Sequence, residues 1–212
     1  MQFGKHMVCL DATHGTCKAE ILEDNQLKSM SSYLYTLVVR NNVTGQGSPV
    51  CWMVTNSQDR HPITNWLIWL RSLGYTPSSV MIDNSDVEIA AIRQAYGQDV
   101  RINICQWHIL RAWRKQTIEK VILRNPHRRR PATSSQLIAA HRKEALNRLI
   151  AMMKANDEPE FEMMYDELCL WIEEHEAQWD AAGLLAYFDD NYLGKKKEWS
   201  NAFRQVMKKH GR

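Results

Sequence analysis

Two aspartates end two similar apolar segments, and their carboxylates could bind a divalent cation. Asp11 follows Met7-Val8-Cys9-Leu10, and Asp83 follows Val80-Met81-Ile82. Apolar runs of this length, followed by turn-forming residues, are typical of strands buried on both faces of a parallel pair. Ligands of open α/β sheets bind beyond the carboxyl ends of the strands, and hard cations prefer carboxylate oxygens. The alternative is that each aspartate only caps a loop, which is the commoner role of an aspartate at the end of a strand.

The elements that would position these aspartates fill the first half of the chain. Two segments rich in β-branched and aromatic residues flank a turn at 41–48, which predicts antiparallel neighbours. Gly15 is predicted to begin a connection after the first strand. Ser85 and Glu88 form a capping box, in which the Glu88 side chain reaches back to the start of its helix. The predicted order is β-β-β-α-β-α-β, with strands at 7–13, 33–39, 50–55, 79–83 and 100–104 and helices at 63–73 and 85–96.

The second half of the chain has a helical pattern throughout. The change at Cys105 predicts two domains, an α/β core at 1–104 and an all-α segment at 105–212. A basic stretch between two prolines, at 124–131, predicts a loop. The helices are predicted at 105–122, 135–155, 158–175 and 178–192, with a short helix around Trp199 and Phe203.

Composition limits the class of protein. The chain has 212 residues, 44% of them hydrophobic, and can bury a core. It contains neither the run of roughly 20 apolar residues that a membrane span needs nor a secretory signal, so no membrane partner is expected. Five cysteines are an odd number with no disulfide pattern, which suits a reducing compartment, nuclear or cytoplasmic. There is no glycine-rich phosphate loop that would indicate a nucleotide-dependent enzyme.

Basic residues cluster at two places that could contact phosphates. Arg128, Arg129 and Arg130 lie in the predicted loop, and further basic residues, Arg111, Arg114 and Lys115, lie in the helix before it. Such clusters bind nucleic acid through sequence-independent contacts with the backbone. The alternative is a solvated charged surface, and the net charge of +3 is only weak support for binding.

Cys105 and His108 have the spacing of half a zinc site. Two further ligands would be needed, and only His127 and His141 are loosely available. The alternative is a structural cysteine followed by a helix-capping histidine. Zinc binding or redox chemistry at Cys105 is the third and weakest functional hypothesis.

The predicted strand order resembles that of ribonuclease-H-like folds, in which acids on the first and fourth strands hold two divalent metals. Three segments, Leu10-Asp11-Ala12-Thr13-His14-Gly15-Thr16, Met81-Ile82-Asp83-Asn84 and Ile104-Cys105-Gln106-Trp107-His108-Ile109-Leu110-Arg111-Ala112, resemble the transposase domain of Mutator-like elements. The resemblance covers 7–115 and, less closely, 178–204. It implies a ribonuclease-H-like core interrupted by a helical insertion.

By this resemblance Asp11 and Asp83 would be the first two catalytic acids, with Mg²⁺ or Mn²⁺ as the cofactor. The expected partner is DNA, at transposon ends and at the target, and a second copy of the chain is left open. The expected place of action is the nucleus. Cys105 and His108 would mark a strand-to-helix junction that helps to position DNA.

The chain departs from the family at the third acid. The family has a glutamate after the helical insertion in an Asn-Asn-x-x-Glu context, and this motif does not occur here. Glu198, Asp189 and Asp190 do not match it. We therefore expect either a truncated form of the transposase core, which cleaves and transfers DNA strands when complete, or an inactive remnant that binds DNA or a protein partner.

Overall fold

The computed structural model describes residues 7–23, 26–41, 43–124 and 131–204. Within the described chain, two compact units are found, Met1–Cys105 and Gln106–Arg212. The division lies one residue beyond the boundary that the sequence predicted. Each unit is described by itself below.

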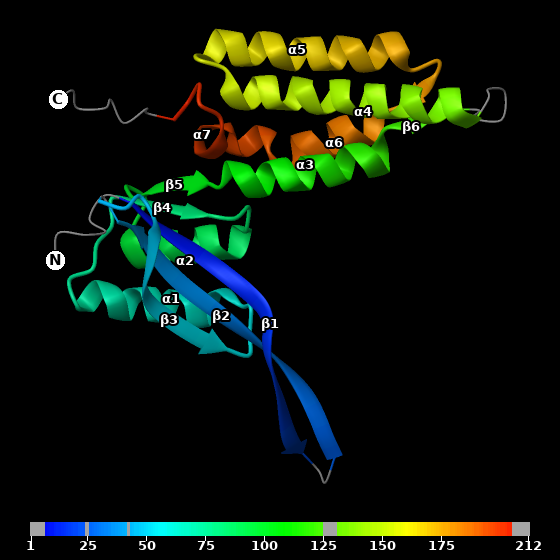
Figure 1. Ribbon diagram of the computed structural model, residues 1–212. Helices are drawn as coiled ribbons and strands as arrows, with labels where there is room; N and C mark the ends of the chain where they lie inside the picture. Colours follow the sequence, from blue (N-terminus) through cyan, green and yellow to red (C-terminus); the bar gives the residue numbers. More distant parts are fainter. Residues whose placement is uncertain (1–6, 24–25, 42, 125–130, 205–212) are drawn as a thin grey trace. The chain divides into compact units, whose positions relative to one another are not determined.

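A mixed sheet forms the centre of unit 1 (Figure 1). Among the described residues it has five strands in the order β3-β2-β1-β4-β5. β1 pairs with β2 and β2 with β3 in antiparallel fashion, whereas β1 with β4 and β4 with β5 are parallel. The sheet is compatible with a ribonuclease-H-like fold. The elements, in chain order, are β1 (Met7–Glu23), β2 (Gln26–Arg40), β3 (Gly47–Thr55), α1 (Arg60–Ser72), β4 (Ser79–Ile82), α2 (Asp86–Tyr96) and β5 (Arg101–Ile104).

The core of unit 1 lies between the sheet and the helices α1 and α2. Alternate residues of β1, Val8 and Leu10, are buried and pack in one cluster with Ile63 and Leu67 of α1 and Ile92 of α2. The apolar residues of each helix recur at three- and four-residue spacing, so that one face of the helix meets the sheet. This packing fixes the direction of every side chain on β1, because successive residues of a strand point to opposite faces.

The prediction for β1 was wrong in two respects. The strand does not end at residue 13: β1 and β2 continue as a long two-stranded hairpin, paired as far as Glu23 and Gln26 with an irregularity between His14 and Lys18 (Figure 1). Nor is β1 buried on both faces, because Val8 and Leu10 are in the core whereas Asp11 is exposed. A strand that pairs with an antiparallel neighbour on one side can leave one face in solvent.

Unit 2 consists mainly of helices. They surround an aromatic centre formed by the buried ring of Trp113 and three neighbouring rings. The centroid of the Trp113 ring lies 5.9 Å from that of Phe188, 5.4 Å from that of Tyr192 and 5.4 Å from that of Trp199. The elements are α3 (Gln106–Lys120), β6 (Ile122–Leu123), α4 (Pro131–Lys154), α5 (Glu158–His175), β7 (Trp179–Asp180), α6 (Ala182–Asn191), the 3-10 helix η2 (Leu193–Lys195) and α7 (Lys196–Trp199). No helix in the described ranges is both long enough and apolar enough to cross a membrane.

The helix predicted at 105–122 is shorter than expected. Ile122 and Leu123 instead form β6, which pairs with β7. Val121 and Ile122 fit the helical spacing as well as a strand, and a two-residue ladder with a segment far along the chain leaves no periodic signal. The predicted loop at 124–131 lies largely outside the described residues.

Candidate functional site

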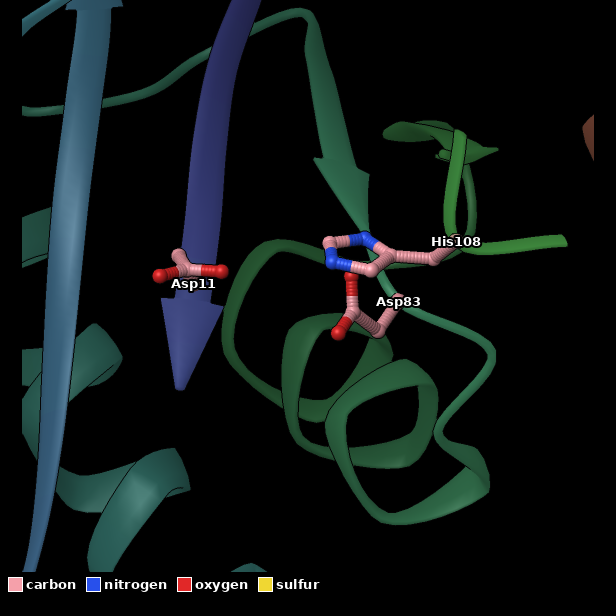
Figure 2. A group of neighbouring side chains, drawn as sticks. All are labelled: Asp11, Asp83 and His108. Atoms are coloured by element: carbon pink, nitrogen blue, oxygen red, sulfur yellow. The ribbon is translucent and has the colours of Figure 1, made fainter. Parts of the chain in front are cut away.

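Asp11 lies in β1, and Asp83 directly follows the last residue of β4, the parallel neighbour of β1. In the parallel pair Cys9 is opposite Met81, so the two aspartates, each two residues further along, share the next position on the same face. A carboxylate oxygen of Asp11 lies within 4.8 Å of one of Asp83. Figure 2 shows the Asp11 side chain on β1 and the Asp83 side chain beyond the end of β4. The structure thus brings together the two acids that the sequence selected.

The donor chemistry of this pair suits a hard divalent cation. Asp11 is exposed and Asp83 is partly buried, so solvent reaches the carboxylates. Two unit negative charges about 5 Å apart in water repel each other by roughly 1 kcal/mol, and the repulsion grows as the surroundings become less polar. A divalent cation would remove this repulsion, and Mg²⁺ and Mn²⁺ prefer such oxygen ligands. The residues present therefore fit a metal site, although two aspartates supply only part of a coordination shell.

Glu88 is a third carboxylate in the same region of unit 1, and the sequence did not select it as a site residue. It lies on α2 and is only 5% exposed. Together with Asp83, Tyr35 and Gln58 it lines a cleft of about 300 Å³. Burial, and then the negative charges of Asp83 and Asp11, raise the pKa of the Glu88 carboxyl to about 8. The only sequence signal for a site role was that Glu88 lies five residues after Asp83. The capping-box pattern gave Glu88 a different role, as a helix cap.

Cys105 ends unit 1 close to the acid pair. Its amide donates to the Ile82 carbonyl at 2.7 Å, and it follows Ile104, which is opposite Ile82 in the β4–β5 pair. Burial, followed by the neighbouring Cys105 and Asp11, raises the pKa of the Cys9 thiol. Elevated thiol pKa values reduce the thiolate population and so do not favour nucleophilic chemistry at Cys9.

His108 belongs to unit 2, in the first turn of α3. Its ring makes an edge-to-face contact with Trp107, with 4.7 Å between the ring centroids. Because Cys105 and His108 belong to different units, the role expected for this pair stays a prediction. Of the further zinc ligands considered, His127 lies outside the described residues, and His141 is stacked on Trp179 with 4.1 Å between the ring centroids.

One face of α3 carries exposed basic and aromatic side chains. Arg111, Arg114 and Lys115 are exposed, as is the ring of Trp107, which is 61% exposed. The Arg111 guanidinium lies over the Trp107 ring, 5.7 Å from its centroid. We call these four residues the α3 basic face. Arg128, Arg129 and Arg130, the other predicted phosphate contacts, lie outside the described residues.

The acids that failed to match the family motif lie in unit 2. Asp189 accepts a hydrogen bond of 3.0 Å from the Tyr165 hydroxyl, which links α6 to α5. Asp190 is exposed. Glu198 lies in α7, where its backbone carbonyl accepts from the Arg204 guanidinium at 3.0 Å. These contacts account for Asp189 as a structural residue of the helical unit.

Comparison with known proteins finds a distant structural neighbour and no related family. No protein-family model matches the chain, and no curated protein matches it. Among solved structures, the chain is similar to the Drosophila P element transposase strand transfer complex, with 13% sequence identity and a TM-score of 0.35. The match covers 57% of this chain and 31% of that chain. The chain therefore spans about a third of the length of that neighbour.

Proposed function

We propose that this chain is the core of a Mutator-like transposase, a ribonuclease-H-like domain that binds DNA and uses divalent metal to cleave and transfer its strands. The observation that carries the proposal is the Asp11–Asp83 pair, whose carboxylate oxygens lie within 4.8 Å on neighbouring parallel strands. The three sequence segments that resemble the family support it, since two of them contain these aspartates and the third begins α3.

Each group of residues has a separate task in this proposal. Asp11 and Asp83 would hold Mg²⁺ or Mn²⁺, which when bound polarises the phosphodiester and stabilises its attacking and leaving oxygens. The alternation along β1 supports this role, because the packing of Val8 and Leu10 in the core leaves the Asp11 carboxylate in solvent. The α3 basic face would bind the sugar–phosphate backbone, where arginine and lysine neutralise phosphate charge. The proposed place of action of the whole chain is the nucleus.

The test is metal-dependent nicking of supercoiled plasmid DNA by the full chain, compared with Asp11→Asn and Asp83→Asn. We expect nicking in Mn²⁺ that both substitutions abolish and that EDTA prevents. The matched control is Asp59→Asn, which alters an exposed aspartate at the start of α1 and should leave nicking unchanged. Nicking that survives both site substitutions would contradict the metal role of the pair.

The second candidate is an inactive remnant that binds DNA through the α3 basic face. The observation that favours it is the missing third acid: the family motif is absent, and Asp189 is engaged by Tyr165. The same assay separates the two functions. DNA binding with no nicking in Mn²⁺ would support the remnant, and nicking lost in both variants would support the transposase core.

A further inference from the structure

Glu88 is a buried acid, and one oxygen of its carboxylate has no hydrogen-bond partner among the described residues. Its side chain is 5% exposed, and its Oε2 atom accepts no hydrogen bond from any residue that the structure describes. Burial of a charged group without compensation is costly, and buried carboxylates are normally paired, hydrogen-bonded or bound to a metal. The burial of Glu88 therefore requires a compensating interaction.

Packing alone does not supply that reason. Glu88 shares the inner face of α2 with Ala91, Ile92 and Ala95, each of which is fully buried. At this position an apolar side chain would satisfy the core at lower cost. A glutamate there retains a polar group at the end of the helix nearest to Asp83.

Helix capping does not supply it either. The Ser85 hydroxyl accepts from the Glu88 amide at 3.3 Å, which is the first half of the predicted capping box. The second half requires the Glu88 carboxylate to accept from the Ser85 amide, but that amide donates to the Asp83 carbonyl at 2.9 Å. The prediction that Glu88 reaches back was thus wrong, and its carboxylate is left for another role.

The surroundings of Glu88 are those of the acid pair. Glu88 and Asp83 line the same cleft, together with Ala12, the residue after Asp11. Both aspartates act on the Glu88 carboxyl through their negative charge, and Glu88 in turn raises the pKa of Tyr35, for which burial is the larger cause. Asp83 and Glu88 thus line one cleft within unit 1, and Asp11 lies near enough for its charge to act on the Glu88 carboxyl.

We propose that Glu88 supplies the third carboxylate of the divalent-metal site formed by Asp11 and Asp83. The inference rests on the proposed function, because that function assigns metal to the two aspartates. It gives a reason for the buried carboxylate, which is stabilised by the cation when the site is loaded. It also completes the set of three acids inside unit 1, without a residue from the helical unit.

The coordination chemistry favours a third acid. Mg²⁺ takes about six oxygen ligands, and two such ions would share the four carboxylate oxygens of Asp11 and Asp83. Glu88 adds two more oxygens from a different direction, because it comes from α2 and not from the sheet. Its position in the third residue of α2 also places a negative charge near the positive end of the helix dipole.

The test is Mn²⁺ binding to the full chain by calorimetry at a fixed neutral pH. The variants are Glu88→Gln, which keeps the shape and removes the charge, and Asp83→Asn, which removes an acid of the pair. The matched control is Asp86→Asn, which removes an exposed acid from the same turn of α2. We expect Asp83→Asn to abolish binding, Glu88→Gln to weaken it at least about tenfold, and Asp86→Asn to leave it unchanged.

The outcomes separate this inference from the function beneath it. Wild-type affinity in a folded Glu88→Gln chain, with binding lost in Asp83→Asn, overturns the inference and leaves the metal pair intact. Absence of Mn²⁺ binding by the wild type, or binding indifferent to Asp83→Asn, overturns both. If circular dichroism shows that Glu88→Gln does not fold, Glu88→Asp takes its place: reduced affinity supports the inference, and wild-type affinity contradicts it.

Discussion

Asp11 of β1 and Asp83, the residue directly after the parallel strand β4, have carboxylate oxygens within 4.8 Å of each other. Like charges held at this distance destabilise the folded chain unless a cation lies between them. The pair should therefore lower the free energy of unfolding in the absence of metal and raise it when metal is bound. The sign of each effect can be measured through the stability of the fold.

Removal of metal should reverse the order of stability of wild type and Asp11→Asn. In EDTA we expect Asp11→Asn to be as stable as the wild type or more stable by up to about 1 kcal/mol, because one repulsive charge is lost. With Mn²⁺ at ten times its dissociation constant, the wild type should gain about 1.4 kcal/mol and the variant nothing. Urea unfolding midpoints measure both effects. An equal gain from Mn²⁺ in the two proteins would show that Asp11 is not a ligand.

The sequence predicted the aspartate pair because its signal is local. Each acid follows a short apolar run, and the helix crossover between the runs implies parallel strands whose ends meet at one edge. The length of β1 left no such signal, since Gly15 indicates a turn and the pairing of the continuation with β2 comes from contacts across the hairpin. Glu88 was assigned to the wrong role for a related reason. The spacing from Ser85 to Glu88 indicates a cap, and only the fold shows that the Asp83 carbonyl already accepts from the Ser85 amide.

Aromatic residues show the same limit. Helical spacing alone does not distinguish Trp113, which is fully buried, from Trp69, which is 53% exposed on α1. Both lie at helical positions that alternate with polar residues. Only the identity of the element that packs against each helix decides which face is covered.

Substitution of the two tryptophans of α3 should reduce stability by very different amounts. Trp113 is fully buried among Phe188, Tyr192 and Trp199, so Trp113→Ala should destabilise unit 2 by about 3–5 kcal/mol through the cavity it leaves. Trp107 is 61% exposed, and Trp107→Ala should cost less than about 1 kcal/mol. Denaturant unfolding followed by circular dichroism tests both. Similar losses in the two variants would contradict the assignment of Trp113 to the aromatic centre.

The α3 basic face should give DNA binding its salt dependence. Each of Arg111→Ala and Arg114→Ala should reduce the slope of log affinity against log salt by about 0.9, the value for one lost phosphate contact. Lys115→Ala should have a smaller effect, because its ammonium lies 3.8 Å from the Glu119 carboxylate. Fluorescence anisotropy with a duplex of arbitrary sequence measures the slopes.

The control for this series is Lys143→Ala, which removes an exposed lysine from α4. It changes the net charge by the same amount as each test variant, so an equal reduction in slope would mean that general charge, and not the α3 basic face, governs binding. Trp107→Ala should lower affinity with no change in slope, because the ring carries no charge. A slope that none of the α3 substitutions alters would exclude this face as the DNA contact.

His141 should make the helical unit less stable in acid. Its ring is stacked on Trp179, with an angle of 12° between the planes, and its Nε2 atom has no hydrogen-bond partner in the described part of the chain. Burial and the nearby His175 lower the pKa of His141, whereas Glu144 raises it. A depressed pKa means that the folded chain binds the proton less readily than the unfolded chain. Stability is therefore fully present above the unfolded pKa of about 6.5 and is lost as the pH falls below it.

The substitution His141→Phe keeps an aromatic ring against Trp179 and removes the titrating group. We expect the difference in unfolding free energy between pH 7.5 and pH 5.0 to be smaller in this variant than in the wild type. His61→Gln, at an exposed histidine of α1, should keep the wild-type difference. If His141→Phe retains the full pH dependence, the acid sensitivity arises elsewhere, and protonation of His141 does not disrupt the stack. If the difference in unfolding free energy is smaller in His141→Phe and unchanged in His61→Gln, the loss of stability in acid is assigned to the His141 ring, because each substitution removes one histidine.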